Sequence, residues 1–156
     1  MKTVKGDIWK FHERGEWICV TTNGFVKADG LAVMGRGTAM QCTRRYPEAP
    51  TSLGRFIQRH GNVVGQFMPG LKILSFPVKH NWWEKADPEL IRESAKQLVE
   101  IEPFIPRGFA LKTSGKCYLP WPGCGNGQLQ WKHVSGIIRP ILDDRFVVVE
   151  YDPETV

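Results

Sequence analysis

The chain has 156 residues, of which 42% are apolar and 24% are charged, and its formal net charge is +5. This length and composition predict one globular domain over residues 1–156 with a sizeable core. No apolar run reaches transmembrane length, which argues against a membrane partner, whereas the positive charge favours an anionic partner such as a nucleotide or a nucleic acid.

The four cysteines, Cys19, Cys42, Cys117 and Cys124, lie far apart in the sequence and form no CxxC pair. Their spacing predicts neither a zinc site nor a disulfide framework, so we expect reduced thiols, a cytoplasmic protein and no metal site. The N-terminus begins with a positive charge but lacks the apolar stretch of a signal peptide.

Two strands are predicted in the first part of the chain. The first covers residues 3–5 and ends at Gly6-Asp7, where Asp7 either accepts a hydrogen bond from a donor group of the ligand or caps a turn. A nearly continuous apolar run over residues 16–22 predicts a buried strand that ends at Asn23. Ligands of open α/β sheets bind at this edge, so Asn23 either contacts a sugar hydroxyl or begins a tight turn.

Glycines dominate the segment that follows. Gly30, Gly35 and Gly37 fall within eight residues, and a helical pattern with Thr38 as the expected N-cap runs over residues 38–46. Glycine allows close approach of the backbone to a ligand, and the first N–H groups of a helix are unpaired. The segment is therefore predicted to bind phosphate.

The middle of the chain is predicted to hold a short helix over residues 51–60 and a hairpin. Residues 62–68 and 71–78 would form its two strands, joined by Pro69-Gly70. Asp87 as N-cap and Pro88 as the first helical residue then predict a helix that runs to about residue 102, where Pro103 stops it. Basic side chains precede the hairpin and either meet nucleic-acid phosphates or form a solvated face: Arg44, Arg45, Arg55, Arg59 and His60.

A second glycine-rich loop, residues 122–127, follows a predicted strand over residues 116–120. A helix over residues 131–142, which Pro140 should kink or shorten, and a buried strand over residues 146–150 complete the chain. Strands and helices alternate apart from the single hairpin, so we expect an α/β fold with a mixed sheet. Two glycine-rich loops together favour a ligand with more than one phosphate.

Several of these segments, in this order, resemble a macro domain. Gly6-Asp7-Ile8, Asn23, the first glycine loop and Gly123-Cys124-Gly125-Asn126-Gly127 carry the resemblance across nearly the whole chain. Residues 33–41, 76–82 and 125–131 resemble more closely the branch that contains terminal ADP-ribose glycohydrolase and the antitoxin macro domains that remove ADP-ribose from thymidine in DNA. That glycohydrolase has an aspartate where this chain has Gly127, which favours the antitoxin-like members.

The resemblance implies a three-layer α/β/α fold that binds ADP-ribose without a cofactor or metal. Asp7 would take the adenine amino group, with the Ile8 backbone nearby, and Asn23 would face the distal ribose. Lys79 would match the catalytic lysine of the branch. The two loops would hold the pyrophosphate and close over the distal ribose, through Met34, Gly35, Arg36, Gly37 and Thr38 in the first and Pro122, Gly123, Cys124, Gly125, Asn126 and Gly127 in the second.

Three functions remain open at this stage. The first is a metal-independent hydrolase that removes ADP-ribose from a macromolecule, with thymidine in DNA favoured over acidic side chains of proteins. Lys79 would act as a nucleophile or as a charge, and cleavage would pass through an oxocarbenium-like state. The second is an ADP-ribose 1″-phosphate phosphatase, and the third is a non-catalytic ADP-ribose reader. The expected partners are ADP-ribose or an ADP-ribosylated substrate, with single-stranded DNA a candidate, and we expect a monomer.

Overall fold

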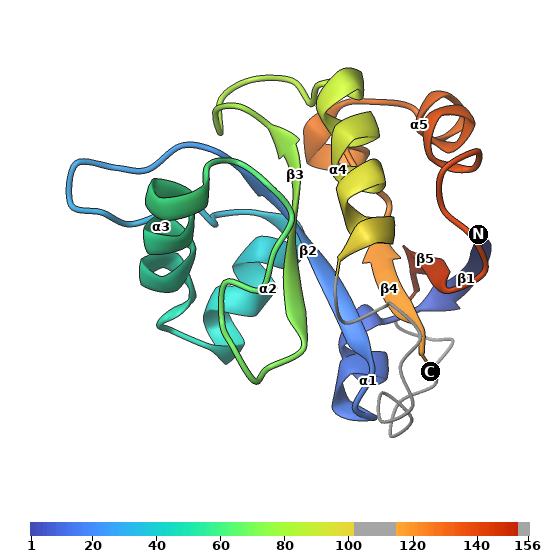
Figure 1. Ribbon diagram of the computed structural model, residues 1–156, viewed down its shortest axis with the longest axis horizontal. Coiled ribbons are helices and arrows are strands. Elements are labelled where there is room, and N and C mark those ends of the chain that lie inside the picture. Colours follow the sequence, from blue (N-terminus) through green and yellow to red (C-terminus); the bar gives the residue numbers. More distant parts are fainter. Residues whose placement is uncertain (102–114, 153–156) are drawn as a thin grey trace.

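A parallel sheet forms the centre of the computed structural model, which describes residues 1–101 and 115–152. Within these ranges its five strands have the order β1-β5-β4-β2-β3. The strands are β1 (Lys2–Gly6), β2 (Trp17–Asn23), β3 (Ile73–Lys79), β4 (Cys117–Pro120) and β5 (Phe146–Tyr151). All four of their pairings are parallel, so the carboxyl ends of the strands meet at one edge of the sheet (Figure 1).

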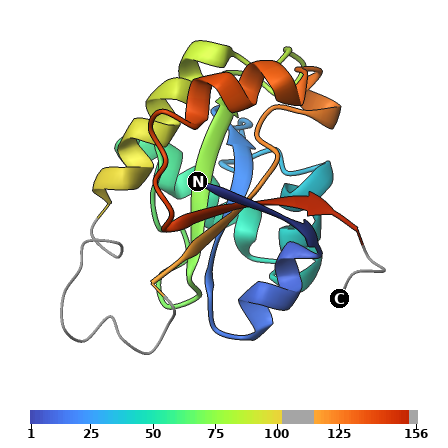
Figure 2. The ribbon, with the colours of Figure 1, turned by 90° about the vertical axis from the view of Figure 1, so that its right-hand side faces the viewer.

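Helices cover both faces of the sheet (Figure 2). One layer contains α1 (Ile8–Glu13), α2 (Gly37–Arg45) and α3 (Ala49–His60), and the other contains α4 (Pro88–Glu100) and α5 (Trp131–Ile138). Side chains alternate between two cores, as a strand requires: Ile18 and Val20 pack in one cluster and Cys19 packs in the other. The predicted three-layer α/β/α fold is confirmed.

The predicted hairpin, and with it the mixed character of the sheet, is wrong. Residues 62–68 form no strand, and their one ladder contact is an antiparallel bridge between Gly65 and Ser75. Phe67 and Met68 are each 4% exposed and pack in the core from a loop. An apolar run indicates that a segment is buried but not that it forms a strand. Here a buried loop along the edge of β3 gives the same sequence pattern as a strand.

The helices differ from their predictions in several places, and α3 begins at Ala49 rather than residue 51 while α5 ends at Ile138 rather than residue 142. Helix α1 was not predicted, because six residues are too short to show a helical stripe. The N-cap of α2 is Arg36, not Thr38, and its side chain caps no N–H group. Asp87 is the N-cap of α4 as predicted, and the predicted helix end at residues 102 and 103 lies outside the described residues.

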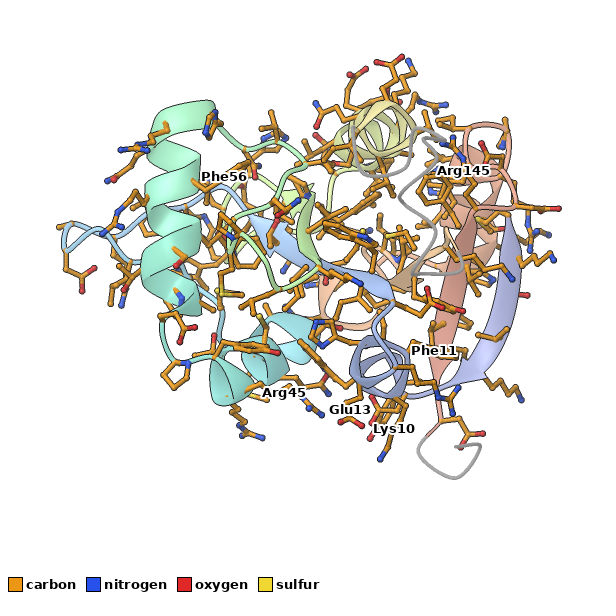
Figure 3. All side chains as sticks on the ribbon, turned by 60° about the horizontal axis from the view of Figure 1, so that its bottom comes forward. Lys10, Phe11, Glu13, Arg45, Phe56 and Arg145 are labelled. Carbon is orange, nitrogen blue, oxygen red and sulfur yellow. The ribbon has the colours of Figure 1, made fainter. Side chains whose placement is uncertain are left out.

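Helices α1 and α2 are joined by Arg45, which comes from the predicted basic region. Its guanidinium Nη1 lies 3.3 Å from Oε1 of Glu13, and its Cζ lies 4.6 Å from the centre of the Trp9 ring (Figure 3). Arg45 therefore has an intramolecular role, while Arg44, Arg55, Arg59 and His60 remain exposed. Among the helices of the described residues, none combines the length and apolar character needed to cross a membrane.

The strand order reverses direction between β2 and β4. The chain leaves β2 through α2 and α3 towards β3, and leaves β4 through α5 on the opposite face towards β5. Ligands of open α/β sheets bind in the crevice that such a reversal creates at the carboxyl ends of the strands. Both predicted glycine loops lie there, because one follows β2 and the other follows β4.

Helix α3 packs against the first glycine loop at Gly54. A Cβ added to Gly54 would overlap the backbone oxygen of Gly30, and the Ala32 N–H donates to the Pro50 carbonyl at 3.0 Å. The missing side chain of Gly54 therefore lets the loop lie directly on the helix.

We expect Gly54→Ala to lower the free energy of unfolding by about 2 kcal/mol or more, because the backbone of the loop must shift. Urea denaturation measures this change. Gly136→Ala is the matched control, since Gly136 is exposed in α5 with nothing within 4 Å of an added Cβ, and it should raise stability by about 0.5–1 kcal/mol. Equal stabilisation by both substitutions would contradict the close approach at Gly54.

Candidate functional site

A cleft of about 1000 Å³ opens at the carboxyl edge of the sheet, between the loops that follow β2 and β4. Lys79, at the end of β3, is part of its wall. The other predicted site residues that line it are Asn23, Met34, Gly35, Arg36, Gly37, Thr38, Gly123, Cys124, Asn126 and Gly127. The structure thus brings most of the predicted site together from three separate segments of the chain.

Four predicted residues lie outside the lining of this cleft. Ile8 lines a smaller cavity of about 240 Å³, which shares Gly37 and Thr38 with the large cleft. The Asp7 carboxylate accepts the Trp9 N–H at 3.0 Å and so caps α1. Pro122 and Gly125 belong to the second loop but line neither cavity.

The side chains of Asn23 and Met34 hold the first glycine loop in place. Asn23 Nδ2 donates to the Val33 carbonyl in the loop, and Asn23 Oδ1 accepts the Phe25 N–H, both at 3.0 Å. Asn23 therefore has the turn-forming role that the sequence left open, and it also lines the cleft. The buried Met34 side chain anchors the loop in the core, while residues 35–37 stay exposed where α2 begins.

The second loop reaches its conformation through glycines with positive φ. Gly123 has φ +73° and Gly125 has φ +68°, in the left-handed region that favours glycine. At Gly127 an added Cβ would lie 3.0 Å from Cβ of Ala86, and the Gly127 carbonyl accepts the Ala86 N–H at 3.0 Å. The loop is thereby fastened to the segment that leads into α4.

Lys79 is buried, with 7% of its surface exposed. Its Nζ lies 3.4 Å from the Trp82 carbonyl oxygen and 3.5 Å from that of Asn126, and among the described residues no carboxylate is within ion-pair distance. Burial, and then the nearby positive charge of Arg36, hold the pKa of Lys79 below its ordinary value. The positive charge of Lys79, at the wall of an open cleft, is thus balanced only by two long contacts to carbonyl oxygens within the described residues.

The backbone around Lys79 is fixed from several sides. The Lys79 carbonyl accepts from Asn62 Nδ2 at 3.0 Å and from the Gly24 N–H at 3.2 Å. The carbonyls of the two preceding residues accept from Ser94 Oγ and from the Asp87 N–H, at 2.7 and 2.8 Å. The position of this lysine therefore depends on α4 and on segments that flank β2 and α3.

Charged side chains in the lining are mostly cationic. Among the described lining residues the cations are Lys27, Arg36 and Lys79, and Glu84 is the one carboxylate. Glu84 Oε1 accepts from Asn81 Nδ2 at 2.7 Å, which holds the carboxylate in place. Sequence reasoning missed Glu84, because nothing local marks a single glutamate in a loop. Within the described ranges no group of His, Cys, Asp and Glu could hold a metal ion.

Two tryptophans, Trp82 and Trp83, are part of the cleft wall. Trp82 is 50% exposed and Trp83 is 58% exposed, and both line the cleft. Cys124 lines it as well, but burial raises the pKa of its thiol to about 11, so the thiol stays protonated at neutral pH and is a poor nucleophile.

The solved structures that are similar to this chain include macrodomains. The macrodomain of Thermus aquaticus DarG is 28% identical, with a TM-score of 0.68 over 97% of each chain. The macrodomain of Mycobacterium tuberculosis DarG is 23% identical, with a TM-score of 0.67 over 97% of each chain. Thermosipho africanus DarTG in complex with ADP-ribose is 20% identical, with a TM-score of 0.67 over 97% of this chain and 41% of that one.

A curated relative points to the same group. The DNA ADP-ribosyl glycohydrolase of Thermus aquaticus is 28% identical over 122 residues, which make up 72% of this chain and 32% of that protein. The match thus spans about a third of the length of this relative. No protein-family model matches the sequence. The solved structures agree with the resemblance inferred from the motifs.

We expect the pKa of Lys79 to lie below that of a lysine in a short peptide, because folding disfavours its charged form. Arg36→Gln should raise that pKa, since removing a like charge favours the ammonium. NMR titration of lysine side chains labelled at Cε measures both values. Arg55→Gln on α3 is the control, and a Lys79 pKa that does not respond to Arg36→Gln would contradict the electrostatic account.

Proposed function

We propose that this chain, a macrodomain related to those of DarG, binds ADP-ribose in the large cleft and hydrolyses the bond between ADP-ribose and a macromolecule. The observation that carries the proposal is the position of Lys79. A buried lysine with a lowered pKa stands between two glycine-rich loops, in the crevice where α/β sheets bind ligands.

The first loop and α2 would bind the pyrophosphate. Helix α2 begins at the cleft with Gly37, its N-cap side chain satisfies none of the first N–H groups, and Arg36 adds a positive charge. Unpaired N–H groups at a helix N-terminus attract anions without a metal. The smaller cavity beside Gly37 and Thr38 would hold the adenine against Ile8, the residue that follows Asp7 in the chain.

Lys79 would face the distal ribose. Hydrolysis breaks the bond from the anomeric carbon to the leaving group and passes through an oxocarbenium-like state. A neutral amine can attack the anomeric carbon, whereas an ammonium can hold the leaving group or its developing charge. Burial makes the neutral form more accessible, and Lys79→Arg separates the two roles, because arginine keeps the charge but cannot act as the nucleophile.

Glu84 would supply the carboxylate that the second loop lacks at Gly127. Cleavage at an anomeric carbon usually needs a carboxyl group that moves a proton or activates water. Glu84 lines the same cleft as Lys79, and Asn81 engages one of its oxygens. The other oxygen would accept a proton from the attacking water.

The substrate we favour is ADP-ribosylated thymidine in single-stranded DNA. The relative from Thermus aquaticus is named for DNA as its substrate. The net charge of +5 and the cationic lining of the cleft favour an anionic macromolecule. In this proposal residues 1–156 form one macrodomain, and ADP-ribosylated DNA is its partner.

A product assay by mass spectrometry tests this function. The protein should release ADP-ribose from single-stranded DNA that is ADP-ribosylated on thymidine, and faster than from glutamate-ADP-ribosylated protein. Lys79→Ala should lower turnover at least about a hundredfold while ADP-ribose binding by calorimetry persists.

The control is Lys96→Ala, because Lys96 lies on the exposed side of α4. Phosphate release from ADP-ribose 1″-phosphate alone would replace the proposal with the phosphatase function. Tight ADP-ribose binding with no product from any substrate would leave a reader.

Glu84→Gln is expected to lower kcat by about 10²–10⁴, the usual contribution of general acid–base catalysis, because the amide cannot accept the proton. The affinity for ADP-ribose should change less than about threefold, since the substitution keeps size and hydrogen bonding. Stopped-assay kinetics and calorimetry measure the two effects. Glu93→Gln, on the surface of α4, is the control, and an unchanged kcat in Glu84→Gln would remove Glu84 from the mechanism.

A further inference from the structure

Three aromatic side chains form a cluster at the cleft: Phe25, Trp82 and Trp83, here called the aromatic rim. The rings of Phe25 and Trp83 are 5.2 Å apart at 72°, and those of Trp82 and Trp83 are 5.5 Å apart at 88°. Half or more of each tryptophan is exposed. Large aromatic side chains usually stabilise a fold by being buried. Those that stay exposed next to a cleft therefore indicate a binding role.

The rim is fixed to the backbone from two sides. Phe25 comes from the loop after β2, where its N–H donates to Asn23 Oδ1 at 3.0 Å. The tryptophans come from the loop after β3, where the Glu84 N–H donates to the Asn81 carbonyl at 3.2 Å. The edge-to-face contact between Phe25 and Trp83 joins the two loops and orients these rings before any ligand binds.

The rim lies beside the proposed reacting position. The Trp82 carbonyl is 3.4 Å from Lys79 Nζ, and both tryptophan side chains line the same cleft as that lysine. The part of the substrate attached to ADP-ribose must therefore leave the cleft past this region. The unit of the polymer next to the modified group is then within reach of the aromatic rings.

Cations line the same cleft as the two tryptophans. They are Lys27, Arg36 and Lys79, and Glu84 is the one carboxylate among the described lining residues. Aromatic rings interleaved with cations match a single nucleic-acid strand, in which bases alternate with phosphates. An acidic peptide would satisfy the cations but offers no regular partner for the exposed rings.

We propose that Trp83, supported by Phe25 and Trp82, is a stacking platform for the nucleobase next to the ADP-ribosylated nucleotide in single-stranded DNA. This inference rests on the proposed function and names how the same site recognises its polymer. The platform makes the enzyme prefer an oligonucleotide over an isolated ADP-ribosylated nucleoside. Stacking of one base on one aromatic side chain corresponds to about 5- to 150-fold in affinity.

The test compares kcat/KM on an ADP-ribosylated nonanucleotide with kcat/KM on ADP-ribosyl-thymidine. Trp83→Leu keeps an apolar side chain but removes the ring, and Trp83→Phe keeps an aromatic face. The preference for the nonanucleotide should fall at least about fivefold in Trp83→Leu and stay within about twofold in Trp83→Phe. Equal losses on both substrates, an unchanged preference, or a loss confined to ADP-ribosylated protein would overturn the platform.

A second readout does not depend on turnover. Unmodified oligothymidylate should quench the tryptophan fluorescence of the wild-type protein, with a midpoint that moves to higher concentration as salt rises, because phosphates are bound as well. Trp83→Leu should weaken this binding, and Lys96→Ala on α4 should leave it unchanged. Quenching without any hydrolysis would keep the platform and reject the proposed hydrolase, whereas hydrolysis without quenching would do the reverse.

Discussion

The position of Lys79 at the carboxyl end of β3, with 7% of the residue exposed, is the constraint on which the site depends. Burying a lysine side chain costs free energy, because its charged group loses hydration. Within residues 1–101 and 115–152, Lys79 Nζ has only long contacts to two carbonyl oxygens, and a second cation, Arg36, is nearby. Hydrogen bonds from α4, Asn62 and Gly24 to the backbone carbonyls at the end of β3 hold the lysine in this unfavourable position.

The two glycine loops are joined to this strand end rather than free. The first rests on α3 at Gly54, and Asn23 at the end of β2 donates a hydrogen bond to its Val33 carbonyl. The second reaches the segment before α4 through Gly127 and Ala86, and the same segment donates a hydrogen bond back to β3. Cleft, lysine and loops therefore form one connected unit, which is the preorganisation that stabilisation of developing charge requires.

Sequence patterns predicted most of this arrangement, and their failures have physical causes. The buried strands and the Asp87 cap were predicted correctly. A continuous apolar run and an aspartate before proline depend mainly on neighbouring residues of the chain, so the sequence alone is enough to recognise them. The hairpin at residues 62–68 was wrong, because Phe67 and Met68 are buried from a loop. Glu84 and the exposed state of Trp83 could not be foreseen, since both follow from how the loop after β3 folds over the cleft.

A structure of the Lys79→Ala variant with ADP-ribose would test the central claim most directly. The account predicts the pyrophosphate against the N–H groups at the start of α2, with the anomeric carbon of the distal ribose turned towards position 79 and Glu84. ADP-ribose bound outside the cleft, or bound with its distal ribose directed away from position 79, would contradict it.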